Sequence, residues 1–160
     1  LIELGHKNIA FLASNFFLSS EKERYQGYLK ALEYANITFK PEWLIQEPVT
    51  KNSRLLSMIK NGEITAIMAV NDIIAIELMN VCESNKVNVP EDVSIIGFDD
   101  IEKAKYQKIA LSTIKQYFNK IGYEAARILV RSISDQDLGC CKVLLPVKVI
   151  ARDSTSYTKS

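Results

Sequence analysis

The sequence predicts an α/β protein built around a parallel β-sheet, and three observations support this fold class. Short apolar runs of strand length recur along the chain, and each is followed by polar residues and then by a segment with helical periodicity. Each connection is long enough to hold the crossover helix that parallel neighbours require. Hydrophobic residues make up 48% of the 160 residues and charged residues 24%, which is the composition of a globular domain.

Strands and helices are expected to alternate as far as residue 100. The expected strands are residues 8–13, 43–45, 65–70 and 93–98. The expected helices between them are residues 20–34, 52–62 and 72–84. Helix starts are indicated by Ser20 with Glu23, by Asn52 or Ser53, and by Asp72, because side chains of these types bond the free amides of a first helical turn.

The pattern changes after residue 100. The elements expected there are a short polar turn or helix at 101–108, a strand at 111–114, an amphipathic helix at 119–133, a strand at 142–150 interrupted by Pro146, and a frayed tail at 154–160. At the other end, residues 1–4 followed by Gly5 and His6 are typical of the last turn of a helix with a glycine cap. We therefore expect the sequence to start within a longer protein.

Composition and charge exclude several classes of protein for this segment. Twenty Lys and Arg against nineteen Asp and Glu leave a net charge of +1 without a block of like charge, so the segment itself is not expected to bind DNA. The longest apolar run, residues 64–70, is too short to span a bilayer, and no leader opens the sequence. Cys82, Cys140 and Cys141 form no Cys-x-x-Cys pair, so we expect neither a disulfide framework nor a metal site, and the free thiols favour a reducing cytoplasm.

Catalytic chemistry and bound cofactors are not expected either. The only histidine, His6, lies at an apparent helix end, where a capping role or a solvated position is expected. The sequence contains no Gly-x-Ser-x-Gly elbow, no dinucleotide fingerprint and no phosphate loop. The acid pair Asp99–Asp100 also suggests a response-regulator receiver, but a receiver places its acid pair after the first strand, and this pair follows the fourth.

Ligands of an open parallel sheet bind beyond the carboxyl ends of its strands. The residues at those positions are Ser14–Asn15, Asn71–Asp72 and Asp99–Asp100. Together with Arg24 from the first helix, these amides and carboxylates suit a sugar, whose hydroxyls both donate and accept hydrogen bonds. The alternative is purely local, because Asp72 can be only a helix cap and Asp99 only a turn residue. Candidate aromatic platforms for a sugar ring, each of which can equally be a core residue, are Phe16, Trp43, Phe98 and Phe118.

Several motifs agree in order and spacing with one family. They are Gly5-His6-Lys7-Asn8-Ile9-Ala10, Glu23-Arg24-Tyr25-Gln26-Gly27-Tyr28, Asn71-Asp72, residues 89–100, residues 111–116, and Arg152-Asp153-Ser154-Thr155. Jointly they resemble the lactose/galactose-repressor family of bacterial transcription regulators over essentially the whole chain. The resemblance implies a three-layer, parallel-sheet lobe of a periplasmic binding protein type I-like fold with part of a second lobe. It assigns residues 1–108 to the second effector-binding lobe, 109–140 to a return into the first lobe, and 141–160 to the final crossing strand and tail.

The resemblance also implies a function. The chain would be the effector-binding and dimerisation domain of a cytoplasmic regulator of sugar-utilisation genes, and its operator-binding headpiece would lie outside this sequence. The implied ligand-binding residues are Arg24, Asn71, Asp99, Gln116 and Phe118, with Ser20 as a weaker transfer. An aromatic residue that some members place after the second strand is not evident, since Pro48-Val49-Thr50 stands there. Whether the effector induces or co-represses, and which sugar it is, the sequence does not determine.

A homodimer is implied as well, because operators are palindromic. The candidate interface residues are Leu55, Met58, Ile73, Ile76 and Met79, and each can equally be a core residue.

Two other functions remain as alternatives: an extracytoplasmic sugar receptor of a transport system, which shares the architecture, and a sugar-processing α/β enzyme. An upstream signal peptide would favour the receptor, and an upstream helix-turn-helix would favour the regulator. If the lobe assignment is right, residues Ile121, Ala125, Ile128 and Leu129 form an apolar stripe that residues 1–110 do not cover.

Overall fold

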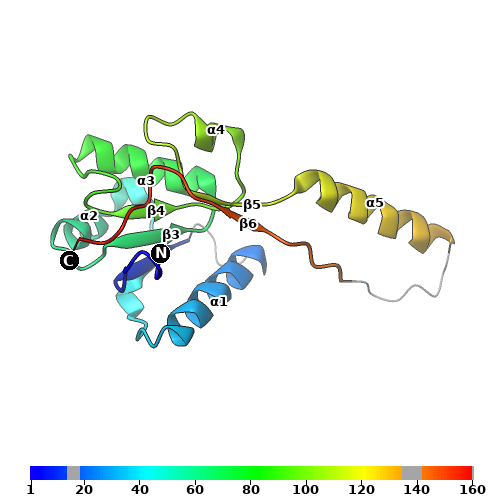
Figure 1. Cartoon of the computed structure of the whole chain (residues 1–160), viewed down its shortest axis with the longest axis horizontal. Coiled ribbons are helices and arrows are strands. Elements are labelled where there is room, and N and C mark those ends of the chain that lie inside the picture. The colour runs from blue at the N-terminus through cyan, green and yellow to red at the C-terminus, as the bar shows by residue number, and fades with distance from the viewer. Residues whose placement is uncertain (14–18, 135–141, 160) are drawn as a thin grey trace.

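The computed structural model describes residues 1–13, 19–134 and 142–159 of the chain, and its centre is a four-stranded parallel sheet (Figure 1). The strands are β1 (Ile9–Leu12), β2 (Leu44–Ile45), β3 (Ala66–Ala69) and β4 (Ser94–Ile96). Their order across the sheet is β2-β1-β3-β4, and each neighbouring pair is parallel. The predicted α/β class and parallel sheet are therefore confirmed, although Trp43 belongs to the 3₁₀ turn η1 (Pro41–Trp43) and not to a strand.

Helices cover both faces of the sheet. Helix α1 (Ser19–Tyr34) lies on one face, and α2 (Ser53–Lys60) with α3 (Asp72–Ser84) lies on the other (Figure 1). Right-handed crossovers explain this division, because the chain moves one way from β1 to β2 and the other way from β2 to β3 and from β3 to β4. A second 3₁₀ turn, η2 (Val49–Lys51), precedes α2. The result is one lobe with three layers.

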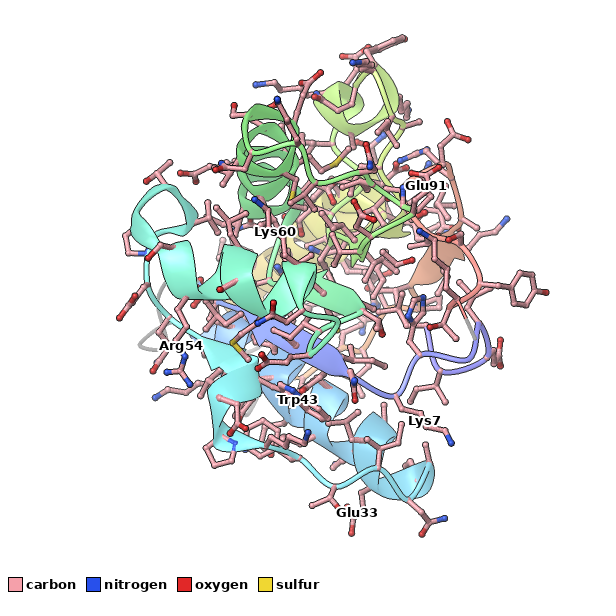
Figure 2. All side chains as sticks on the ribbon, turned by 90° about the vertical axis from the view of Figure 1, so that its left-hand side faces the viewer. Lys7, Glu33, Trp43, Arg54, Lys60 and Glu91 are labelled. Atoms are coloured by element: carbon pink, nitrogen blue, oxygen red, sulfur yellow. The ribbon has the colours of Figure 1, made fainter. Side chains whose placement is uncertain are left out.

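The interior beneath α1 is aromatic. The ring centroid of Phe11 lies 5.3 Å from that of Tyr25 and 5.4 Å from that of Tyr28, and the Tyr28 hydroxyl donates to the Ile9 carbonyl at 2.8 Å. Trp43 is also buried, so it belongs to the core and not to a sugar platform. Charged side chains such as Lys7 and Glu33 point outward (Figure 2).

The second half of the chain leaves this lobe. After α4 (Glu102–Lys105), strand β5 (Thr113–Lys115) pairs with β6 (Lys148–Ile150) in an antiparallel ribbon, and α5 (Phe118–Ser134) extends from it away from the sheet (Figure 1). The strand expected over residues 142–150 is shorter, because β5 ends at Lys115 and leaves the residues before Lys148 without a partner strand. Ile121, Ala125 and Leu129 are exposed and Ile128 is half-buried, so residues 1–110 leave the expected stripe largely uncovered. Within the described residues, no helix has the length and hydropathy needed to cross a membrane.

The C-terminal segment is ordered by hydroxyl groups. Ser154 is fully buried, its Oγ donates to the Ile95 carbonyl at 2.6 Å, and its own carbonyl accepts from the Ile95 amide at 2.8 Å. The Ser156 amide donates to Ser94 Oγ at 3.1 Å. The prediction of a frayed tail is therefore wrong for residues 154–159, which satisfy backbone groups at the open edge of β4.

His6 is buried and bridges two distant segments. Its Nδ1 lies 3.0 Å from Thr65 Oγ1 and its Nε2 lies 3.0 Å from the Ser156 carbonyl oxygen. Because a carbonyl only accepts, Nε2 donates to Ser156, whereas the Thr65 hydroxyl can either donate to Nδ1 or accept from it. Burial lowers the pKa of His6, and the hydrogen bond to Ser156 opposes that shift only in part. The expected solvated position is wrong, whereas the helix-end role of the preceding turn is confirmed by Gly5, whose φ is +89°.

The lowered pKa of His6 predicts a loss of stability in acid. The unfolded chain takes up the proton first, so the free energy of unfolding is fully retained above about pH 6.5 and decreases below it by up to ~1.4 kcal/mol per pH unit. Denaturant unfolding between pH 5 and 8 measures this. His6→Gln should flatten the profile in that range, and an unchanged pH dependence in the variant would contradict the assignment.

Candidate ligand-binding site

The polar ends of β3 and β4 meet at one edge of the sheet. Asn71 follows β3 and Asp99 follows β4, and these strands are adjacent and parallel. The amide of Asp72 donates to the Phe98 carbonyl at 2.9 Å, which holds the two strand ends together. The common edge expected for Asn71 and Asp99 is therefore present.

Arg24 connects helix α1 to both strand ends. Its Nη2 lies 3.1 Å from Asp99 Oδ1, and its Nη1 donates to the Val70 carbonyl at 2.5 Å. Its guanidinium carbon sits 3.9 Å from the centroid of the Phe98 ring, a cation–π geometry. The Arg24 and Asp99 side chains are only 16% and 22% exposed, so the ion pair is partly withdrawn from water. Phe98 is thus a platform for Arg24.

Gln116 completes the cluster from the segment that follows β5. Its Nε2 donates to Asp99 Oδ1 at 2.7 Å, so this oxygen accepts hydrogen bonds from both Gln116 and Arg24. Within the described residues, no hydrogen bond occupies Asp99 Oδ2. Asp99 has φ of +117°, a rare conformation for a residue with a side chain, and its amide donates to the Ile114 carbonyl at 2.8 Å. Within this part of the chain, Arg24 and Gln116 thus hold one of the two carboxylate oxygens of Asp99.

Asp100 contacts a different set of side chains from Asp99. Its carboxylate is 4% exposed, pairs with the guanidinium of Arg152, and lies 3.5 Å from Lys115 Nζ. Burial alone would raise the pKa of Asp100, but Arg152 and Lys115 outweigh burial and hold it below its ordinary value. Lys115 ends β5 and Arg152 follows β6, so Asp100 connects the antiparallel ribbon of β5 and β6, which we call the crossing ribbon, to the lobe.

Asp72 is not the cap of helix α3. The N-cap of α3 is Asn71, whose Oδ1 accepts from the Ile74 amide at 2.9 Å. The fully buried carboxylate of Asp72 accepts from Thr113 Oγ1 at 2.5 Å and from the Ile101 amide at 2.9 Å. Burial raises the pKa of Asp72, and these two hydrogen bonds oppose that shift. The capping prediction was wrong because Asn and Asp both favour the N-cap, and here the earlier residue occupies it.

An open groove of about 720 Å³ runs between α1 and the sheet, and we call it the α1 groove. Its lining includes the polar side chains of Ser20, Arg24 and Gln116, the ring of Phe98, and the apolar side chains of Leu1 and Ile2. Ser20 lies inside the first turn of α1, which already includes Ser19, and so does not cap the helix. Phe118 is 54% exposed at the start of α5 and does not line the groove. Ser14, Asn15 and Phe16 lie outside the described residues.

The residues suggested for a dimer interface separate into two groups. Leu55, Met58, Ile76 and Met79 are buried within this chain and pack in its core. Ile73, in the first turn of α3, is 65% exposed. Of the five, Ile73 alone therefore presents a large open apolar side chain.

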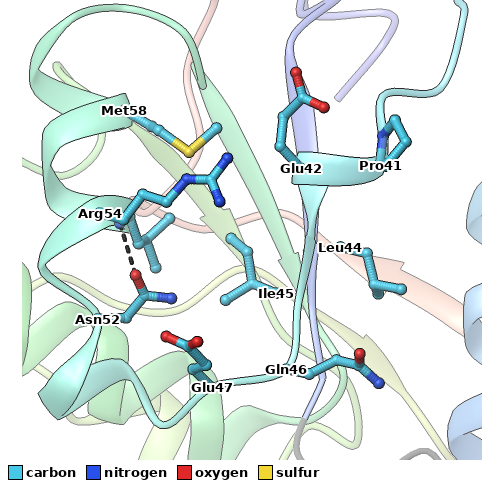
Figure 3. Close-up of a pocket in the computed structure, with 10 residues that line it drawn as sticks. Pro41, Glu42, Leu44, Ile45, Gln46, Glu47, Asn52, Arg54 and Met58 are labelled. Atoms are coloured by element: carbon cyan, nitrogen blue, oxygen red, sulfur yellow. Dashed lines mark hydrogen bonds between the residues drawn. The ribbon is translucent and has the colours of Figure 1, made fainter.

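A second hollow, of about 510 Å³, lies between β2 and α2 at the opposite edge of the sheet (Figure 3). Glu42 and Glu47 approach it from β2 and its flanks, and Arg54 points in from α2 (Figure 3). No sequence motif pointed to it, because exposed charges at these spacings are ordinary for a surface. Within the described residues, no cluster of His, Cys, Asp and Glu suits a metal ion.

Comparisons with known proteins identify the type of domain. Residues 1–155 match the family described as the periplasmic binding protein-like domain. The chain is 33% identical over 162 residues to the HTH-type transcriptional repressor PurR of Aliivibrio fischeri, covering 98% of this chain and 48% of that protein. PurR of Haemophilus influenzae (strain PittEE) is 33% identical over 143 residues, which cover 87% of this chain and 43% of that protein. The chain thus spans about half the length of the curated relatives it matches.

Solved structures agree with this result. The complex of transcriptional regulator CelR with cellobiose superposes with a TM-score of 0.87 at 27% identity, over 96% of this chain and 48% of that chain. A LacI family regulator from Enterococcus faecium with bound ribose superposes with a TM-score of 0.83 at 29% identity, over 99% of this chain and 60% of that chain. The lac repressor dimer bound to operator and the anti-inducer ONPF superposes with a TM-score of 0.82 at 27% identity, over 98% of this chain and 55% of that chain. The chain therefore belongs to the family of periplasmic binding protein-like domains, and it corresponds to the effector-binding portion of lactose/galactose-repressor-type transcription regulators.

Proposed function

We propose that this chain binds a sugar effector within a bacterial transcription regulator that acts on sugar-utilisation genes in the cytoplasm. The observation that carries this proposal is the cluster of Arg24, Asp99 and Gln116 at adjacent strand ends, in a domain family whose relatives are regulators. Its role is binding without catalysis, and it needs no cofactor or metal. Operator DNA is bound through a headpiece outside this sequence.

The atoms left open at the site suit a polyol. Asp99 Oδ2 can accept a hydrogen bond, and the Asn71 amide nitrogen can donate one, since its oxygen already caps α3. The Ser20 and Gln116 side chains line the α1 groove, and Asp99, which does not line it, contacts the groove residues Arg24 and Gln116. Arg24 acts mainly by holding Asp99, because both terminal nitrogens already donate within the chain. Phe118 supplies a ring face once a ligand draws α5 and the lobe together.

Effector binding is transmitted through the crossing ribbon. We assign residues 1–108 to one lobe, 109–140 to a return into the other lobe and 141–160 to the last crossing. A ligand that contacts both lobes stabilises the closed arrangement of the lobes. If the angle between the lobes also sets the spacing of the headpieces, ligand binding changes operator affinity, and operator binding changes ligand affinity by the same coupling free energy. Asp99, which we assign to ligand binding, is adjacent in the chain to Asp100, which holds the ribbon of β5 and β6 through Arg152.

A regulator is favoured over an extracytoplasmic transport receptor. Both share the architecture, but the two curated relatives named above are repressors, and one structural neighbour is a repressor bound to its operator. Dimerisation follows from operator symmetry, with Ile73 as the exposed apolar contact on α3 and the buried Leu55, Met58, Ile76 and Met79 supporting that surface from beneath.

The Asp99→Asn variant tests the site. In the natural protein that contains this chain, calorimetry against a sugar panel including ribose, cellobiose, lactose and galactose should find one sugar that binds and is recovered unchanged. Asp99→Asn should weaken that affinity by at least ~10-fold, because a charge-assisted hydrogen bond is lost. Glu42→Gln, in the hollow beside β2, is the matched control and should leave affinity unchanged. Conversion of the sugar, or equal affinity in both variants, would count against the proposal.

Arg24→Lys tests the positioning of Asp99. An ammonium group cannot bond the Val70 carbonyl and Asp99 with the planar fork of a guanidinium, so affinity for the same sugar should fall ~10-fold or more. Arg54→Lys, on α2, is the control. Circular dichroism verifies that both variants fold, and an unaffected affinity in Arg24→Lys would show that the ion pair does not organise the site.

Ile73→Asp tests the dimer. A charge at this exposed apolar position should raise the dimer dissociation constant by ~10-fold or more, measured by sedimentation, since desolvating a carboxylate opposes association. Tyr34→Asp, at the exposed end of α1, should not alter assembly. A dimer insensitive to Ile73→Asp would place the interface elsewhere.

A further inference from the structure

The hollow between β2 and α2, which we call the β2 hollow, borders the edge strand at the opposite side of the sheet from β4 (Figure 3). Its volume of about 510 Å³ is within the range of binding sites for small molecules. Its apolar floor consists of Ile45, Leu55 and Met58, all of which are buried. Among the described residues, those that line the β2 hollow are all different from those that line the α1 groove. The two sites are therefore separate.

Charged side chains of opposite sign surround this apolar floor. Glu42 lies in η1, just before β2, and Glu47 follows β2, so the two carboxylates approach the hollow from opposite ends of the strand (Figure 3). Arg54 points into the hollow from the first turn of α2 (Figure 3). Within the described residues, none of these three side chains forms an ion pair or a hydrogen bond. Their charges are thus available to a ligand.

A buried amide is a second, independent indication of a ligand. Asn52 is only 8% exposed, and its Oδ1 accepts from the Leu55 amide at 2.8 Å, which caps α2. Within the described residues its Nδ2 makes no hydrogen bond, and the amide group faces Ile45 and Glu47 in the hollow (Figure 3). A buried donor without a partner is unfavourable, so an acceptor bound beside Asn52 would satisfy it.

The positions of these groups select the chemical class of the ligand. Asn52 and Arg54 are both donors at the positive end of α2, which suits a carboxylate. Glu47 lies beside Asn52 and suits a positive group next to that carboxylate (Figure 3). Glu42, beyond the other end of β2, suits a second positive group at a distance, and the apolar floor between them suits a chain of methylene groups. An α-amino acid with a cationic side chain carries these groups in this order.

We propose that the β2 hollow binds a dibasic α-amino acid such as lysine. The carboxylate of the amino acid accepts hydrogen bonds from Arg54 and Asn52. Its α-ammonium group donates to Glu47, and its side-chain ammonium group donates to Glu42. The methylene groups lie on the buried floor. This site does not depend on the effector at Asp99 being a sugar.

Calorimetry of the natural full-length protein with L-lysine and two matched compounds tests the site. Lysine should bind saturably, with a dissociation constant of ~1 mM or below. Cadaverine lacks only the carboxylate of lysine, and norleucine lacks only its side-chain amino group. Each should bind ~10-fold or more weakly than lysine, because a charge-assisted hydrogen bond is lost.

Two variants assign the contacts to residues. Arg54→Gln should weaken lysine binding ~10-fold or more without weakening cadaverine binding, since cadaverine has no carboxylate to lose. Glu42→Gln should weaken lysine binding to the same extent without weakening norleucine binding. Glu33→Gln, at an outward-pointing position on α1, is the control and should bind all three compounds like the natural protein (Figure 2). Circular dichroism verifies that the variants fold.

Four outcomes would overturn the proposal. They are the absence of saturable lysine binding, equal affinities for the three compounds, lysine affinities that both variants leave unchanged, and competition of lysine with ribose or cellobiose, which would place lysine in the α1 groove. The sugar titrations above contain no amino acid, so Glu42→Gln and Arg54→Lys remain valid controls there. Failure of one site therefore leaves the other intact.

Discussion

The ion pair between Arg24 and Asp99 is the contact on which the arrangement of the site depends. Arg24 comes from α1, its second hydrogen bond ends on Val70 after β3, and Asp99 follows β4 and also receives Gln116 from the ribbon. Four separate segments therefore converge on two side chains. Because both are mostly withdrawn from water, each would be left with an unsatisfied charge without the other, a penalty larger than the net value of the pair. The same contact thus holds the ends of β3 and β4 together and fixes the position of the Asp99 carboxylate.

The adjacent acids Asp99 and Asp100 contact different partners. Asp99 and Asp100 both have positive φ, at +117° and +56°, so the backbone at the end of β4 is held in a conformation that residues with side chains rarely adopt. That twist directs one carboxylate to Arg24 and the next to Arg152 and Lys115. Asp99 and Asp100 therefore connect Arg24 of α1 with the ribbon of β5 and β6 through one short stretch of backbone.

The sequence predicted the regular elements well and the buried polar contacts poorly. Strand and helix periodicity located β1, β3, α1, α2 and α5, because apolar spacing is a local property. The tail and His6 were misassigned because their partners are remote: Ser154 bonds Ile95 across 59 residues, and His6 bonds Ser156 across 150. Propensity suggested Asp72 as a cap, whereas its carboxylate is fixed by Thr113, 41 residues away. The proximity of Asn71 and Asp99 was accessible in advance, since parallel strands end at one edge.

The apolar surface of this chain is covered unequally. Leu129 and Ile133 on α5 are 62% and 75% exposed, and Leu144 before β6 is 81% exposed. At about 25 cal/mol per Å² of apolar surface, leaving such a stripe in water forfeits several kcal/mol that a packed second lobe would supply. The lobe itself needs no such help, since its sheet interior is closed by buried residues such as Phe11 and Ile67. Burial of α5 and of the segment before β6 against other protein surface would therefore stabilise this part of the chain.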